Sequence, residues 1–173
     1  MDIIIRKLTP DDSEDYQRVR LEGLRLSPDA FGSTYEEEVH FSDDQVRGRL
    51  DNGGENFVLG AFDGNSLIGM AMFRRDSKLK FRHRGGVYAT YVTPTWQNRG
   101  VARKLLTDLI ERAKNIEALE QLHLSVLYGN APDKRLYESI GFVVYGHVPH
   151  ATKHQGRYHD DELMVLFLKV EPV

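Results

Sequence analysis

The chain has 173 residues, 40% of them hydrophobic, which is enough for one compact core and too few for two. Its 23 Lys and Arg residues against 26 Asp and Glu residues give a net charge of -3, which offers no reason to expect nucleic acid as the principal ligand. The lack of cysteine excludes disulfide bonds, thiolate metal sites and cysteine nucleophiles, and it fits a reducing compartment.

The sequence contains no recognisable export or membrane segment. The apolar run within residues 1–6 is too short for a secretion signal, and charged residues interrupt it too early. No stretch approaches the roughly 18 continuous apolar residues that a membrane span requires. We therefore expect a single domain over residues 1–173, located in the cytoplasm and without membrane contact.

The first third of the chain predicts one strand and two helices. A strand over residues 3–8 leads into residues 9–12 (TPDD), which supply a cap, a first-turn proline and an acid three residues after the cap. The helix that begins there should reach about Leu26. After an irregular stretch, residues 42–45 (SDDQ) repeat the capping pattern and predict a short helix that ends near residues 52–54 (NGG). These two helices and the stretch between them can form a lid.

Three strands are predicted next. Apolar runs over residues 56–62 and 66–75 are separated by residues 63–65 (DGN), which is typical of a tight hairpin between antiparallel neighbours. A third strand over residues 85–92 follows a basic connection over residues 78–84.

The clearest helix of the sequence begins near Gly100, because its apolar residues recur with helical period. The apolar residues that share one face are Val101, Leu105, Leu106, Leu109, Ile110 and Ala113. The remaining elements are a strand over 122–127, a helix over 131–140 ended by Gly141, a strand over 142–148, a polar loop over 149–159 and a final strand over 162–170. This order predicts an α+β domain around a central, mixed sheet.

A candidate anion site lies where the third of these strands passes into that helix. The turn over residues 97–102 (QNRGVA) places unpaired backbone N–H groups at the positive end of the helix dipole. Gly100 has no side chain, so an oxyanion can approach the backbone closely. Arg99 and Arg103 can add charge-assisted bonds of about 1.5–3 kcal/mol each. Phosphate or pyrophosphate is the expected ligand. The alternative is that Gly100 serves only to start the helix.

Two segments resemble motifs of the GNAT superfamily of acyl-CoA-dependent N-acetyltransferases. Residues 92–106 (VTPTWQNRGVARKLL) are similar to motif A, whose pattern is Gln/Arg-x-x-Gly-x-Gly/Ala. Residues 124–142 (LSVLYGNAPDKRLYESIGF) are similar to motif B, in which a strand leads to an Asn and then to a helix ending Leu-Tyr-Glu-x-x-Gly-Phe. The two motifs occur in the family's order and separation.

This resemblance implies the GNAT fold from residue 3 to 170: a mixed, mostly antiparallel sheet of about seven strands flanked by four helices, with strands four and five splayed apart. Acetyl-CoA is the implied co-substrate, with its thioester in that gap. Tyr91 and Val92 are implied to offer main-chain groups to the pantetheine arm and the acetyl carbonyl, and Asn130 to contact the pantetheine or diphosphate. The residues implied to hold the pyrophosphate are Gln97, Asn98, Arg99, Gly100, Val101 and Ala102.

Acetyl transfer to an amine poses two proton problems. An alkyl amine with a pKa of about 10 must lose a proton at pH 7, which costs about 4 kcal/mol, and the departing thiolate must gain one. The resemblance places Tyr137 close to the sulfur, where its phenol can donate that proton; the alternative is a tyrosine packed in the core beside Leu136 and Ile140. The resemblance also makes the Val92 N–H the expected donor to the developing oxyanion.

The sequence leaves the general base open. Many GNAT enzymes carry an acid on the fourth strand, whereas residues 85–92 contain none. The remaining sources are a water chain or one of these acids: Glu36, Glu37, Glu38, Asp160 and Asp161. We expect Tyr35, Glu36 and Glu37 to bind a cationic acceptor, although a run of three acids is also typical of a solvated face.

Two further clusters favour plain surface roles. Four histidines (His147, His150, His154 and His159) are irregularly spaced, which favours a mobile surface loop over a metal site. The basic run over residues 74–84 favours a solvated hairpin over a nucleic-acid contact.

The sequence therefore predicts an enzyme that passes an acetyl group directly from acetyl-CoA to a primary amine of a small molecule, peptide or protein, with neither metal nor nucleic acid. A catalytically silent acyl-CoA sensor is the alternative, and the missing fourth-strand acid is its support. A homodimer is common in families of this kind.

Overall fold

The computed structural model describes residues 2–51 and 53–169. The α-helices in this part of the chain are α1 (Ser13–Leu26), α2 (Tyr35–Glu38), α3 (Asp43–Leu50), α4 (Val101–Lys114) and α5 (Ala131–Ile140). The strands are β1 (Ile4–Lys7), β2 (Phe57–Asp63), β3 (Ser66–Arg75), β4 (Arg84–Val92), β5 (Gln121–Leu127), β6 (Val143–His154) and β7 (Arg157–Phe167). The predicted order of elements is confirmed, and α2 adds one helix to the four expected.

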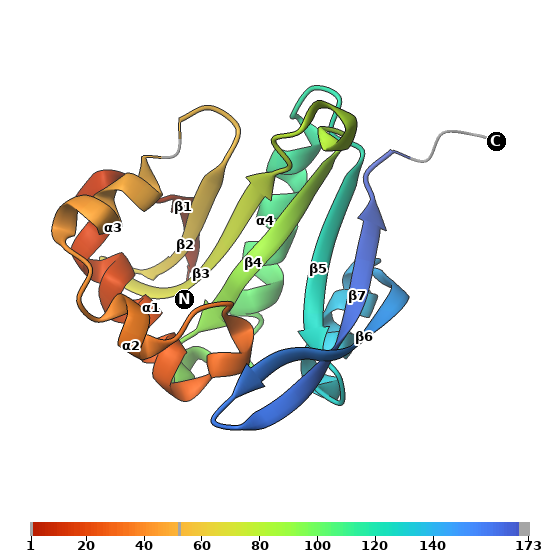
Figure 1. Cartoon of the computed structure of the whole chain (residues 1–173). Coiled ribbons are helices and arrows are strands. Elements are labelled where there is room, and N and C mark those ends of the chain that lie inside the picture. Colours follow the sequence, from red (N-terminus) through yellow and green to blue (C-terminus); the bar gives the residue numbers. More distant parts are fainter. Residues whose placement is uncertain (1, 52, 170–173) are drawn as a thin grey trace.

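The strands form one sheet in the order β1-β2-β3-β4-β5-β7-β6, and only the pair β4–β5 is parallel. In Figure 1, α4 lies behind the sheet, while α1, α2 and α3 group on the opposite side. Each face carries its own cluster of buried side chains, one around α4 and one around α1 and α3. The predicted apolar face of α4 is confirmed, because all its members are buried: Val101, Leu105, Leu106, Leu109, Ile110 and Ala113.

β4 and β5 separate partway along their length. Their pairing ends at Gly86 and His123, whereas β4 continues to Val92 and β5 to Leu127. A bulge near Ala89, which has a φ of 51°, also bends β4 and shifts its register against β3. Figure 1 shows the two strands diverging toward the hairpin formed by β6 and β7. The splay implied by the family resemblance is confirmed.

The stretch before α3 that was expected to be irregular contains the one-turn helix α2. Its first turn is closed by a capping box, in which the Glu37 N–H donates to Thr34 Oγ1 (3.3 Å) and the Thr34 N–H donates to the Glu37 carboxylate (2.7 Å). The Thr-x-x-Glu spacing was the available signal. The capping box predicted for α3 forms between Ser42 and Gln45. Asn52, near the predicted end of that helix, lies outside the described residues.

Glu38, the last residue of α2, is fully buried and ties α2 to α1 and α3. Its carboxylate accepts hydrogen bonds from Arg20 at 2.6 and 2.7 Å, from Arg49 at 2.8 Å, and from Ser33. Burial alone would raise the pKa of Glu38, but the hydrogen bonds from these three partners lower it to about 2. The alternative interpretation of the acidic run as a solvated face therefore does not hold for Glu38.

β6 and β7 form a long hairpin where a polar loop over residues 149–159 was expected. Gln155 and Gly156 make its two-residue turn with φ values of 47° and 78°, as a type I′ turn requires. The loop prediction is wrong because most of this extension of β6 is solvent-exposed, so no apolar alternation marks it as a strand. Residue 170, where the final strand was predicted to end, lies outside the described residues.

Candidate active site

A cavity of about 1100 Å³ opens where β4 and β5 separate. Its wall includes the diverging halves of these strands, the segment from the end of α1 through α2, one side of α5, and the tip of the β6–β7 hairpin. The volume slightly exceeds the usual range of small-molecule sites in proteins. Segments that are distant in the sequence therefore meet at one hollow.

Tyr137 reaches this cavity from α5, with its ring packed edge-on against Phe142 at a centroid distance of 6.0 Å. Its hydroxyl is hydrogen-bonded to Thr90 of β4. Burial, and after it the negative charge of Asp133, raise the pKa of Tyr137 to about 12. The phenol therefore keeps its proton at neutral pH and is available as an acid in the gap between the strands.

Asn130 also lines the cavity, at the start of α5, where its side chain is used as a cap. Asn130 Oδ1 accepts from the Asp133 N–H (3.3 Å), and Asn130 Nδ2 donates to Asp133 Oδ2 (2.7 Å). Desolvation raises the pKa of Asp133. Asp133 and Thr90 were not among the predicted site residues; the Asn-x-x-Asp spacing signals the first, whereas only the tertiary structure reveals the second. The contact of Asn130 with a cofactor stays a prediction.

The backbone of Val92 faces the gap. The Thr93 N–H donates to the Ile68 carbonyl of β3 (2.9 Å), so Thr93 and Ile68 stand at a hydrogen-bonded position of the β3–β4 ladder. Because ladder bonds alternate along antiparallel strands, Tyr91 points its N–H and carbonyl at β3, and Val92, opposite Gly69, points its own away. The Val92 N–H is therefore directed toward the side where β5 has separated.

The side chains around Val92 support this arrangement. Gln97 Nε2 donates to the Val92 carbonyl at 3.0 Å, which fixes the turn that follows β4. The Tyr91 side chain is buried on the α1 side of the sheet, and its hydroxyl donates to Glu22 at 2.8 Å. Burial and this acceptor raise the pKa of Tyr91. The contribution of Tyr91 main-chain groups to a ligand stays a prediction.

The turn before α4 has the geometry of an anion cradle. Gly100 caps the helix with φ 79° and ψ 6°, and Asn98 also has a positive φ of 59°. The first helical bond runs from the Lys104 N–H to the Gly100 carbonyl (3.0 Å), so the N–H groups of Val101 and Ala102 precede the ladder. A Cβ on Gly100 would meet no heavy atom within 4 Å. The backbone here is open to a ligand.

The two arginines beside this turn are held in different ways. Arg99 is exposed and lies over the Trp96 ring, 5.1 Å from its centroid. Arg103 donates to Ser139 Oγ at 2.7 Å and so links α4 to α5. Residues 97–102 follow β4 after a four-residue connection and are not part of the cavity wall.

A family model described as Acetyltransferase (GNAT) family matches residues 9–142. The chain belongs to the GNAT family. The L-amino acid N-acetyltransferase AaaT of Escherichia coli (strain K12) is 26% identical over 160 residues, covering 92% of this chain and 94% of its own. The spermidine N(1)-acetyltransferase of Vibrio cholerae is 29% identical over 116 residues, covering 67% of this chain and 65% of its own. This chain is accordingly an acyltransferase.

Solved structures show the same fold. The GNAT acetyltransferase of Streptococcus pneumoniae has a TM-score of 0.85 at 22% identity, covering 96% of this chain and 99% of that one. The yncA protein of Salmonella typhimurium, solved with its cofactor acetyl-CoA, has a TM-score of 0.83 at 23% identity, covering 99% and 96%. At these identities the likeness concerns the fold alone.

Of the lid residues 35–38 of this GNAT enzyme, three line the cavity and one does not. Tyr35 and Glu36 line the cavity, and the Tyr35 ring lies under the Arg25 guanidinium, 4.0 Å from its centroid. Glu37 lies outside the wall, because its carboxylate caps α2. Glu38 lines the cavity but is held by Arg20 and Arg49, and its low pKa makes it a poor proton acceptor. Contacts of Tyr35, Glu36 and Glu37 with an acceptor stay predictions.

Asp160 and Asp161, two candidate bases from the sequence, lie on opposite faces of β7. Asp160 accepts from the His150 N–H (2.7 Å) and contacts His147 Nε2 (3.0 Å), away from the cavity. Asp161 lines the cavity and accepts from Ser125 Oγ at 2.6 Å. The strand alternation therefore selects one of the two, which their adjacency in the sequence could not do.

The histidine-rich segment is part of the β6–β7 hairpin. The His150 ring stacks on Tyr158 at a centroid distance of 4.5 Å, and His147 packs edge-on against Tyr128. Across residues 2–51 and 53–169, no three His, Asp or Glu side chains converge as a metal site would require. Within the same residues no helix is long and apolar enough to cross a membrane.

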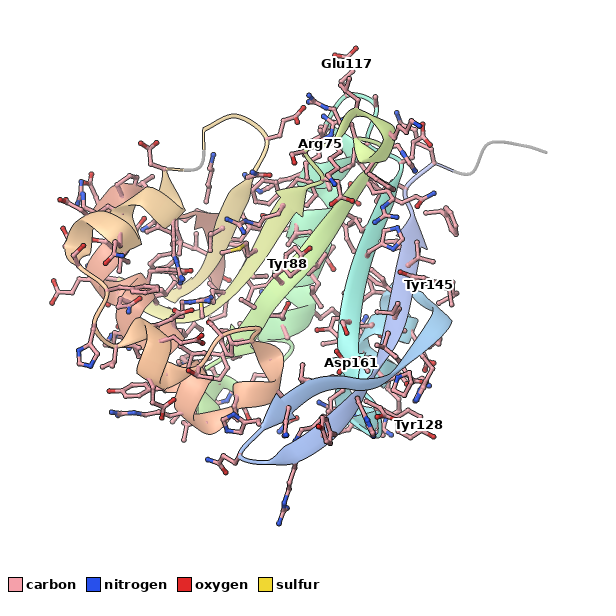
Figure 2. The ribbon with its side chains drawn as sticks, in the orientation of Figure 1. Arg75, Tyr88, Glu117, Tyr128, Tyr145 and Asp161 are labelled. Carbon is pink, nitrogen blue, oxygen red and sulfur yellow. The ribbon has the colours of Figure 1, made fainter. Side chains whose placement is uncertain are left out.

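The basic run between β3 and β4 is partly neutralised by ion pairs. Arg75 and Arg82 both pair with Glu55, and Arg84 pairs with Asp76 at 3.1 Å. Arg75 also donates to the Glu117 carbonyl at 2.8 Å, and both residues lie at the end of the sheet where β4 and β5 still pair (Figure 2). These contacts give the run a structural role.

Proposed function

We propose that this GNAT enzyme transfers an acetyl group from acetyl-CoA to a primary amine of a small molecule or peptide. The observation that carries the proposal is the Tyr137 hydroxyl, which is protonated, hydrogen-bonded to Thr90, and set in the cavity between the diverging strands. The yncA structure, which holds acetyl-CoA in the same fold, supports the choice of acyl donor.

Different residues of the chain bind different parts of acetyl-CoA. The N–H groups at the start of α4, with Gln97, Asn98 and Arg99 beside them, bind the pyrophosphate. The main chain of Val92 contacts the acetyl group, and its N–H donates to the carbonyl oxygen as it gains charge, whereas the N–H and carbonyl of Tyr91 face β3. Asn130 contacts the pantetheine arm.

Tyr137 completes the reaction at the sulfur. The acceptor nitrogen attacks the thioester carbon, the C–S bond breaks, and the phenol gives its proton to the thiolate. The proton that the nitrogen loses on forming the amide restores the phenol, so protons balance within the site. Tyr35, Glu36 and Glu37 stand on the lid side, from which the acceptor enters.

Binding and turnover test this proposal separately. Calorimetric titration of acetyl-CoA measures binding, and release of free CoA measures turnover with a panel of L-amino acids, spermidine and short peptides, chosen from the substrates named for the relatives. We expect both. Binding without turnover would indicate the silent sensor, and no binding would overturn the proposal.

A further inference from the structure

Among the described residues, the cavity wall holds five carboxylates, and only one of them stands on the sheet itself. They are Asp29, Glu36, Glu38, Asp133 and Asp161. Asp29 and Glu36 belong to the lid segment, and Glu38 is enclosed by arginines. Asp133 is bonded to Asn130 on α5. Asp161 alone is carried by a strand, β7, which pairs with β5 on the side away from β4.

The register fixes Asp161 at the level where the strands have separated. Asp161 of β7 pairs with Leu127 of β5, four residues beyond His123, the last residue of β5 that pairs with β4. Ser125, between them on β5, donates its hydroxyl to Asp161 Oδ2 at 2.6 Å. The other carboxylate oxygen, Oδ1, has no hydrogen-bond partner among the described residues. An acceptor that enters the cavity can therefore reach it.

Asp161 and Tyr137 approach the gap from different sides. Tyr137 comes from α5, which packs in the cluster around α4, behind the sheet. Figure 2 shows Asp161 beside the lower part of β5, next to the β6–β7 hairpin, with Tyr88 on β4 across the gap. A thioester lying between the strands would have its sulfur near Tyr137 and its carbonyl open to a nucleophile from the Asp161 side.

We propose that Asp161, oriented by Ser125, binds the acceptor as its ammonium ion and takes the proton that must leave before attack. This inference rests on the proposed function and names the base that β4 lacks. One proton passes from the ammonium to Asp161, which holds it while the neutral amine attacks the thioester and releases it to solvent after the transfer. The second proton lost by nitrogen balances the one that Tyr137 gives to sulfur.

The assignment predicts a difference in pH dependence that a structural role would not produce. With Asp161 present, the ammonium form is productive, so kcat/KM stays nearly flat from about pH 6 to pH 9 for an amine with a pKa of about 10. In Asp161→Asn the free amine must be captured from solution. Its kcat/KM should fall about 10²-fold or more at pH 7 and rise about tenfold per pH unit.

The experiment measures kcat/KM from pH 6 to 9 for the wild type, Asp161→Asn, Ser125→Ala and Asp160→Asn, with the fastest amine of the panel. Asp160→Asn is the matched control, because it removes the adjacent carboxylate on the opposite face of β7. We expect Ser125→Ala to lose about tenfold with a milder slope, and Asp160→Asn to keep the wild-type profile. Calorimetric affinity for acetyl-CoA should be unchanged in all three variants.

A second acceptor amine with a lower pKa tests whether the loss of activity in Asp161→Asn comes from failure to deprotonate the amine. A fluorinated analogue of the same amine with a pKa of about 7 should restore much of the activity of Asp161→Asn at pH 7, because it arrives deprotonated. A flat profile in Asp161→Asn, equal losses in Asp160→Asn, or no rescue by the analogue would overturn the assignment while leaving the proposed function intact. Absence of wild-type turnover with every amine would overturn both.

Discussion

The substitution Gly100→Ala tests whether the start of α4 binds the cofactor. Its effect on Tm reports backbone strain, and its effect on the Kd for acetyl-CoA reports binding. Gly100 has a φ of 79°, a left-handed conformation that costs an L-residue about 1–2 kcal/mol. The added Cβ would meet no protein atom within 4 Å, so strain is the only loss expected in the free protein. At about 2–4 °C per kcal/mol for a domain of this size, we expect Tm to fall by about 2–8 °C.

Acetyl-CoA affinity should fall by more than this strain can explain. The methyl group would occupy open space next to the Val101 and Ala102 N–H groups, where the pyrophosphate is proposed to bind. If it displaces one charge-assisted bond of about 1.5–3 kcal/mol, the Kd for acetyl-CoA should rise about tenfold to about 150-fold. Isothermal calorimetry measures this directly.

Gly54→Ala is the matched control. Gly54 has a φ of 76° and equally open surroundings, but it lies between α3 and β2, away from the cavity. Its substitution should lower Tm by a similar amount and leave the Kd unchanged. If Gly100→Ala also leaves the Kd unchanged, the pyrophosphate does not lie on this turn and the reasoning from the helix N-terminus is refuted.

Two other substitutions test the acid and the lid. Tyr137→Phe should lower kcat by about 10²-fold or more with acetyl-CoA affinity intact, since only the hydroxyl is lost; an unchanged kcat would remove Tyr137 from the chemistry. Because the pKa of Tyr137 is about 12, the wild-type kcat should show no alkaline fall from this group up to about pH 10. Glu38→Gln leaves buried Arg20 unpaired and should cost about 3–5 kcal/mol in thermal or urea unfolding at pH 7. The pKa of Glu38 falls from 4.5 to about 2 on folding, so its contribution is present above pH 4.5 and lost as pH approaches 2; the stability difference from the wild type should shrink by about 3 kcal/mol over that range, and a constant difference would contradict the ion-pair account.

The sequence by itself determined the elements whose signals are local. The buried face of α4 follows from the recurrence of Leu105, Leu106 and Leu109 with helical period, and the hairpin at residues 63–65 follows from its turn residues. The turn around Gly100 is equally local, because a glycine and the first N–H groups of a helix are consecutive in the chain. Tyr137 was selected by its place in a contiguous motif.

Only the tertiary structure decided which polar residues share the cavity. Asp160 and Asp161 are indistinguishable in sequence, and the pairing of β7 with β5 directs one into the cavity and the other away. Glu38 is buried because Arg20 and Arg49 converge on it from two other helices, which no local pattern encodes. Side-chain direction in a sheet depends on register, and register is set by contacts between strands distant in sequence, so the acceptor side of the site could not be read from the chain alone.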